Sequence, residues 1–114
     1  MLASDIREII AEEEEVQVHL EALESIIHRY SKRISESLAE RIERAHTNGE
    51  WIQLSSEECA ARHEQETLHL KAQYDTLQHE LNRTRKKLSS LKHAKDRARR
   101  ILADVAQFRQ NQRH

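Results

Sequence analysis

The sequence predicts an all-α protein, an antiparallel two-helix coiled-coil hairpin, from three observations. Apolar residues recur at alternating spacings of three and four along two long segments, as in the seam of a coiled coil. The single glycine, Gly49, lies between these segments, and the 114-residue chain contains no proline. The composition is 34% charged and 37% hydrophobic with four aromatic residues, which is typical of long helices. We therefore expect one helical hairpin across residues 1–114.

Two ladders of apolar side chains define the expected helices. The first ladder comprises Ile6, Ile9, Val16, Leu20, Leu23, Ile27, Tyr30 and Ile34. The second comprises Tyr74, Leu77, Leu81, Thr84, Leu88, Leu91, Ala98, Leu102 and Val105. Glu13 and Lys95 are polar residues at seam positions. Such residues either fix the register of a coiled coil at some cost in stability, or mark where the hairpin opens or meets a third helix.

The first helix is expected from about residue 4 to about residue 45. After Ile34 the apolar stripe changes phase and continues as Leu38, Ile42 and Ala45, a stutter that locally unwinds a supercoil. His46-Thr47-Asn48-Gly49 then ends the helix, because Asn and Gly tolerate the left-handed backbone conformation.

A turn over about residues 46–54 is expected to precede a second helix over about residues 55–110. Ser55-Ser56-Glu57-Glu58 has the pattern of a capping box, with Ser55 as the cap. A connection this short makes the two helices antiparallel if they pair within one chain.

The charges are divided along the chain. Residues 1–81 hold eight Lys/Arg and 18 Asp/Glu, whereas residues 82–114 hold 11 Lys/Arg and two Asp/Glu. Folding back brings the acidic helix against the basic one, which accounts for the basic end without nucleic acid. The basic residues also interleave with the leucine ladder instead of preceding it, unlike the basic region of a zipper.

Two apolar groups are left outside the seam. Ala94, Ile101 and Phe108 form a second shoulder on the second helix and need another surface to cover them. Trp51, Ile52 and Leu54 cluster at the tip, where Trp51 either folds onto the helix ends or contacts a partner. The shoulder predicts a homo- or hetero-oligomer.

The sequence does not predict a catalytic, metal or cofactor site. His63-Glu64-Gln65-Glu66-Thr67 starts like a zinc motif but lacks the second histidine, and a single glycine excludes a phosphate-binding loop. A two-helix rod has little room for a pocket, so we expect no enzymatic activity, no catalytic residue, no metal and no cofactor. The chain has no apolar run long enough to span a membrane. One cysteine, Cys59, fits a reducing, cytoplasmic compartment.

Three segments resemble the FliJ/YscO group of type III secretion and flagellar export proteins. They are Ile6-Arg7-Glu8-Ile9-Ile10-Ala11, then Gly49-Glu50-Trp51-Ile52-Gln53-Leu54-Ser55, and the second helix from Gln73-Tyr74-Asp75-Thr76-Leu77 to Ile101-Leu102-Ala103-Asp104. Members of that group are coiled-coil hairpins that resemble the central stalk of rotary ATPases.

The resemblance implies a stalk-like partner of a hexameric export ATPase whose body reaches towards the export gate. Its implied ATPase-facing residues are Arg7, Arg97, Arg99, Arg100 and Arg109. The pattern is also similar to small helical subunits of lysosome-biogenesis and kinetochore complexes, and to secretion chaperones that cover a client helix.

Overall fold

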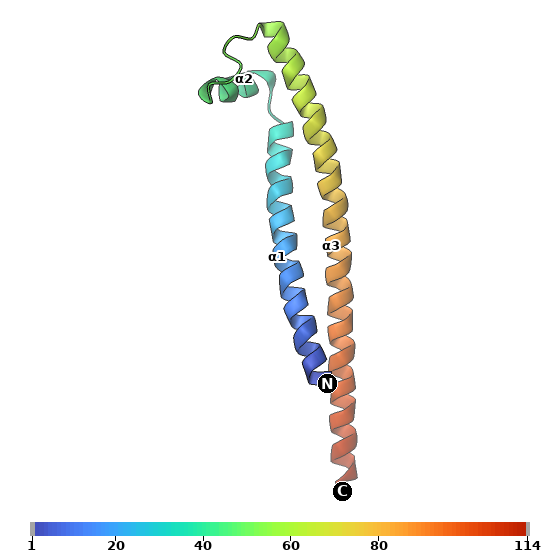
Figure 1. The fold of residues 1–114 in the computed structure, drawn as a ribbon. Helices are drawn as coiled ribbons and strands as arrows, with labels where there is room; N and C mark the ends of the chain where they lie inside the picture. Colours follow the sequence, from blue (N-terminus) through green and yellow to red (C-terminus); the bar gives the residue numbers. More distant parts are fainter. Residues whose placement is uncertain (1, 114) are drawn as a thin grey trace. The chain divides into compact units, whose positions relative to one another are not determined.

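The structure, a computed structural model, describes residues 2–113 and contains three helices (Figure 1). They are α1 (Leu2–Ile34), α2 (Leu38–Thr47) and α3 (Ser56–Gln112). No strand occurs in residues 2–113, so the all-α prediction is confirmed. The helices contribute to two compact units: a terminal unit of Met1–Ala22 with Leu81–His114, and a central unit of Leu23–Glu80.

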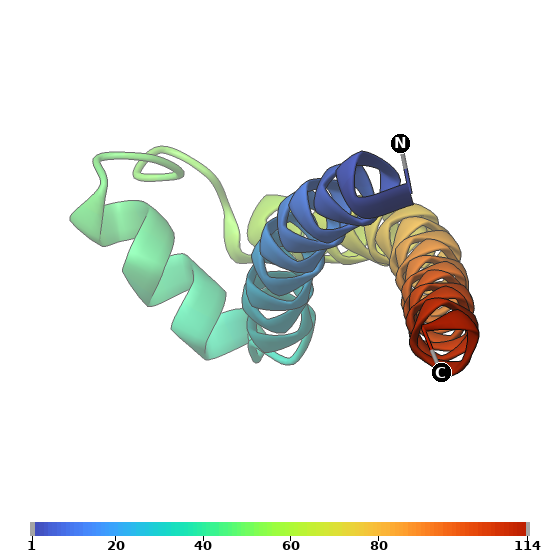
Figure 2. The ribbon, with the colours of Figure 1, turned by 90° about the horizontal axis from the view of Figure 1, so that it is seen from below.

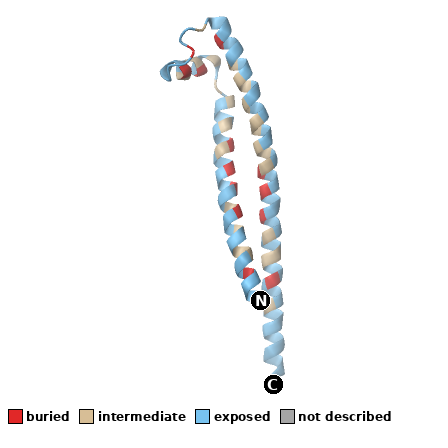
Figure 3. Cartoon of the chain, in the orientation of Figure 1, coloured by how far each residue is buried: buried red, intermediate tan, exposed pale blue. Residues whose placement is uncertain are grey.

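The terminal unit buries the predicted ladders along facing sides of α1 and α3 (Figure 3). The buried side chains are Ile6, Val16 and Leu20 from α1, and Leu81, Thr84, Leu88 and Ala98 from α3. Fully burying one large aliphatic side chain is worth about 1.5–3 kcal/mol, so this row holds the two segments together. Val105, predicted in the same row, is instead 39% exposed.

Two ion pairs link the helices of the terminal unit. The Lys95 ammonium lies 2.7 Å from Glu13 Oε2, and both side chains are only 18% exposed. The Lys87 ammonium lies 3.5 Å from Glu12 Oε1, and both of those side chains are well exposed. The two polar residues that interrupt the predicted seam therefore neutralise each other.

The central unit corrects the prediction of one helix from residue 4 to residue 45. Helix α1 ends at Ile34, and Ser37 caps a separate helix α2 by accepting a hydrogen bond from the Glu40 amide at 3.2 Å. The phase change after Ile34 therefore marks a complete break and not only a stutter. Figure 2 shows that α2 leaves the direction of the adjoining part of α1 instead of continuing it.

The connection from α2 to α3 covers residues 48–55 and places Trp51 in a small core. Gly49 has φ 75° and Trp51 has φ 62°, so the chain turns through two left-handed positions. Trp51, Ala45 and Cys59 are buried together, with Ile42 and Leu54 packed against them. The expected capping box is present: Ser55 Oγ accepts from the Glu58 amide at 3.1 Å, and Glu58 accepts from the Ser55 amide at 3.4 Å.

Candidate protein-binding surfaces

The terminal unit carries an apolar stripe on α3 that no other part of that unit covers. Ile101, Val105 and Phe108 are 51%, 39% and 63% exposed. Their spacings of four and three residues put them on one face of the helix. No described residue after Ala98 is buried. A continuous apolar face in water is typical of a protein interaction site.

Exposed arginines occur in the same unit as this apolar stripe. Four arginines of α3 predicted to contact a partner are exposed, as is a fifth in α1 of the same unit. These residues are Arg97, Arg99, Arg100 and Arg109 in α3, and Arg7 in α1. Ala94, predicted on the same shoulder, is half-buried.

The predicted tip residues have different surroundings. Trp51 is 9% exposed and packs inside the central unit, so the option in which it folds onto the helix ends is the one observed. Leu54 is half-buried against the same cluster, whereas Ile52 is 66% exposed. Trp51 therefore serves the core, which leaves Ile52 as the exposed side chain of the three.

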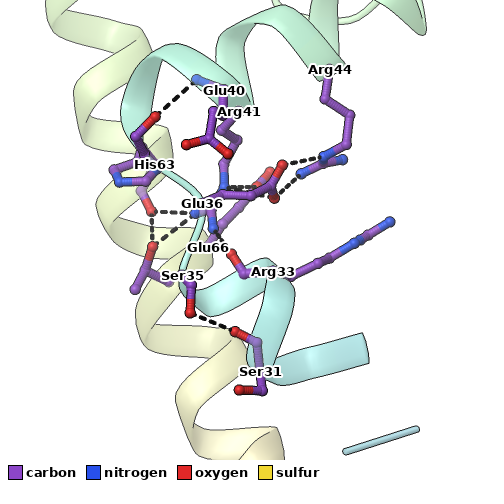
Figure 4. A network of polar contacts seen from close by, with 11 residues as sticks. Ser31, Arg33, Ser35, Glu36, Glu40, Arg41, Arg44, His63 and Glu66 are labelled. Carbon is purple, nitrogen blue, oxygen red and sulfur yellow. Dashed lines mark hydrogen bonds and ion pairs between the residues drawn. The ribbon is translucent and has the colours of Figure 1, made fainter. Parts of the chain in front are cut away.

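Sequence reasoning missed Arg41, whose side chain is fully buried in the central unit. Its guanidinium donates to the carbonyl of Arg33 at 2.6 Å, to the carbonyl of His63 at 3.0 Å and to Thr67 Oγ1 at 2.8 Å (Figure 4). One side chain of α2 thus holds the end of α1 and the first turns of α3. The sequence feature that could have indicated its burial is its position in the apolar stripe, three residues after Leu38 and four before Ala45.

Carboxylates surround the Arg41 guanidinium. Arg41 Nε lies 3.7 Å from Glu36 and 3.9 Å from Glu66. Arg44 donates two hydrogen bonds to Glu36, at 3.0 and 3.2 Å. The Arg44 hydrogen bond lowers the pKa of Glu36, outweighing burial, which acts in the other direction, and the charges of Arg44, Arg41 and Arg33 add to the lowering. The same hydrogen bond raises the pKa of Arg44.

A groove lies beside this polar network, within the central unit. Its volume is about 750 Å³. The lining residues are Ile26, Arg29, Tyr30 and Arg33 from α1, Arg44, Asn48 and Glu50 from α2 and the connection, and Glu66, His69, Leu70 and Gln73 from α3. The sequence predicted little room for a pocket. The break before α2 is what creates this one, because one continuous helix would not have turned Arg44 towards α1 and α3.

Residues 2–113 contain no group of three or more His, Cys, Asp or Glu side chains placed to hold a metal ion. None of the described helices combines the length and apolarity needed to cross a membrane. No protein-family model, curated protein or solved structure matches the chain.

Proposed function

We propose that this chain is a non-catalytic coiled-coil subunit that binds another protein through the apolar stripe of α3. The carrying observation is the exposure of Ile101, Val105 and Phe108 along one helix face. Burying such a side chain completely contributes about 1.5–3 kcal/mol, so a partner that covers all three gains several kcal/mol. The exposed arginines of the same unit favour a partner with acidic residues around its own apolar patch.

The architecture behind this function is an antiparallel coiled coil of α1 and α3. The buried ladder residues of both helices support it, as do the Glu13–Lys95 and Glu12–Lys87 ion pairs. In the terminal unit, Figure 1 draws the two helices with opposite chain directions, in agreement with this pairing. The exposed stripe lies next to the paired face, where a third helix would complete the packing.

The specific partner that the sequence resemblance suggests is a hexameric type III export ATPase in the cytoplasm. In that role the chain would act as a stalk. Arg7, Arg97, Arg99, Arg100 and Arg109 would contact acidic ATPase residues, and the rest of the chain would extend towards the export gate. The exposure of all five arginines within one unit supports this assignment.

The test is a pull-down and activity assay with a purified export ATPase. We expect the wild-type chain to co-sediment with the ATPase and to change its oligomeric state or hydrolysis rate. The double variant Ile101→Ser, Phe108→Ser should lose this effect. Leu68→Ser is the matched control, because Leu68 is 62% exposed on α3 but belongs to the central unit.

Two results would contradict the proposal at different levels. No effect of the wild-type chain on the ATPase would exclude the stalk role. Retained binding by the double variant would exclude the stripe as the contact. A third outcome is that the chain does not bind the ATPase but still forms a stable complex with other proteins through the stripe. In that case the chain is a subunit of another helical assembly, of the lysosome-biogenesis or kinetochore type, or a secretion chaperone.

A further inference from the structure

The groove of the central unit is a second candidate binding site, separate from the α3 stripe. Its volume of about 750 Å³ is far too large for a single ion and lies within the range of ligand pockets, about 300–1,000 Å³. Ile26, Tyr30 and Leu70 in its lining are half-buried and provide an apolar surface. Charged side chains occupy the rest of the wall.

The arginines of the groove fall into two classes. Arg44 is committed to Glu36 by two hydrogen bonds. Within residues 2–113, by contrast, the guanidinium groups of Arg29 and Arg33 make no hydrogen bond or ion pair shorter than 4.0 Å. Both side chains are exposed. The guanidinium groups of Arg29 and Arg33, both on the α1 side of the groove, are therefore available to a ligand.

The spacing of Arg29 and Arg33 selects the ligand geometry. They stand four residues apart in α1, so their Cβ atoms are separated by roughly 5–6 Å, and like charges at this spacing repel each other. A ligand with two oxyanions about one helical turn apart removes that repulsion. Guanidinium groups bind carboxylates and phosphates in a planar, two-pronged geometry that lysine does not offer.

The other charges of the groove argue against a long polyanion. Glu50 and Glu66 lie in the lining opposite α1 and would repel a continuous phosphate backbone. The apolar surface formed by Ile26, Tyr30 and Leu70 also suits an amino-acid side chain better than a phosphate. Both features favour a short peptide segment with localised negative charge.

We infer that the groove binds an acidic peptide segment of a partner protein, with two oxyanions one helical turn apart held by Arg29 and Arg33. The apolar side chain between the oxyanions packs on Ile26, Tyr30 and Leu70. The oxyanions are glutamate carboxylates, because Glu50 and Glu66 in the lining repel the higher charge of a phosphoserine more strongly. This site is independent of the α3 stripe and of the ATPase assignment.

The experiment measures fluorescence anisotropy of the full chain with three labelled 12-residue helical peptides. One peptide has glutamates at positions 5 and 9 around a leucine, the second has phosphoserines there, and the third has glutamines. We expect the glutamate peptide to bind at least tenfold more tightly than the glutamine peptide. Tighter binding of the phosphoserine peptide than of the glutamate peptide would contradict the assignment of the oxyanions to carboxylates. Affinity should fall steeply with added salt.

The double variant Arg29→Gln, Arg33→Gln should bind the glutamate peptide with at least tenfold lower affinity than the wild type. Its far-ultraviolet circular dichroism and Trp51 fluorescence should stay unchanged, because both arginine side chains are exposed. Arg62→Gln is the matched control, an exposed arginine in the same unit that does not line the groove, and it should bind like the wild type. Equal binding of all three peptides would overturn the inference. An equal loss in Arg62→Gln, or tighter binding of a 12-nucleotide RNA than of either anionic peptide, would overturn it as well.

Discussion

Replacing Arg41 with alanine is expected to destabilise the central unit strongly, because Arg41 connects its three helices. The side chain is fully buried and donates hydrogen bonds to Arg33, His63 and Thr67. Removing one partner of a buried charged network costs about 3–5 kcal/mol. The alanine variant also leaves a cavity where the arginine stem was.

The structure places the expected cost at the lower end of that range. The Arg33 carbonyl keeps a second hydrogen bond from the Glu36 amide at 3.2 Å, and the His63 carbonyl keeps one from the Thr67 hydroxyl at 2.8 Å. Glu36 also keeps its bonds from Arg44. Both carbonyls thus keep a donor and only Thr67 Oγ1 loses the one described for it, so we expect a loss of about 3 kcal/mol, or roughly 10 °C in Tm.

The assay is urea unfolding followed by Trp51 fluorescence, because Trp51 lies in the core of the central unit. Arg62→Ala is the control, since Arg62 is exposed, and its unfolding free energy should change by less than about 0.5 kcal/mol. A loss of under about 1 kcal/mol in Arg41→Ala would refute the role assigned to Arg41.

Three further predictions concern the polar pairs and the small core. Glu13→Leu should lower the free energy of unfolding by about 1–3 kcal/mol, because it leaves Lys95 half-buried without its partner. In thermal melts, the double variant Glu13→Leu, Lys95→Leu should recover that loss. Because the pKa of Glu36 is lowered in the folded chain, its contribution to stability is complete above its ordinary pKa of 4.5 and is lost as the pH falls through the lower, folded value. Unfolding curves below pH 4.5 should therefore show a smaller loss in Glu36→Gln than in the wild type. Trp51→Ala should lower the free energy of unfolding by about 3 kcal/mol in urea unfolding followed by circular dichroism, and the exposed Ile52→Ala by less than about 0.5 kcal/mol; equal effects would contradict the packing described.

The heptad pattern predicted most of the buried residues, because period and burial are linked directly in a long helix. Ile6, Val16, Leu20, Leu81 and Leu88 are all buried where the ladders place them. The capping box at Ser55 was also predictable from the sequence, since its two hydrogen bonds form between residues three apart. These features depend on local spacing alone.

Features that depend on distant contacts were not predicted. The break before Leu38 is stabilised by Arg41, whose partners His63 and Thr67 lie 22 and 26 residues away. A charged residue at a stripe position reads as a solvated flank unless its acceptors are known. The sequence alone also does not decide whether Trp51 packs onto the helix ends or contacts a partner, since its burial depends on Ala45 and Cys59 from two different helices. Val105 has ladder spacing, but in the terminal unit it stays well exposed.

Pairing of α1 with α3 inside one chain is the central claim, and zero-length carbodiimide cross-linking tests it directly. The reagent joins a carboxylate to an ammonium that it already contacts, and Glu12–Lys87 and Glu13–Lys95 meet that condition at 3.5 and 2.7 Å. Equal amounts of ¹⁴N and ¹⁵N protein are mixed, unfolded and refolded before cross-linking and mass spectrometry. The account predicts both cross-links, each within peptides of a single isotope. Mixed-isotope cross-links would show that the helices pair between chains, and the absence of both cross-links would contradict the pairing itself.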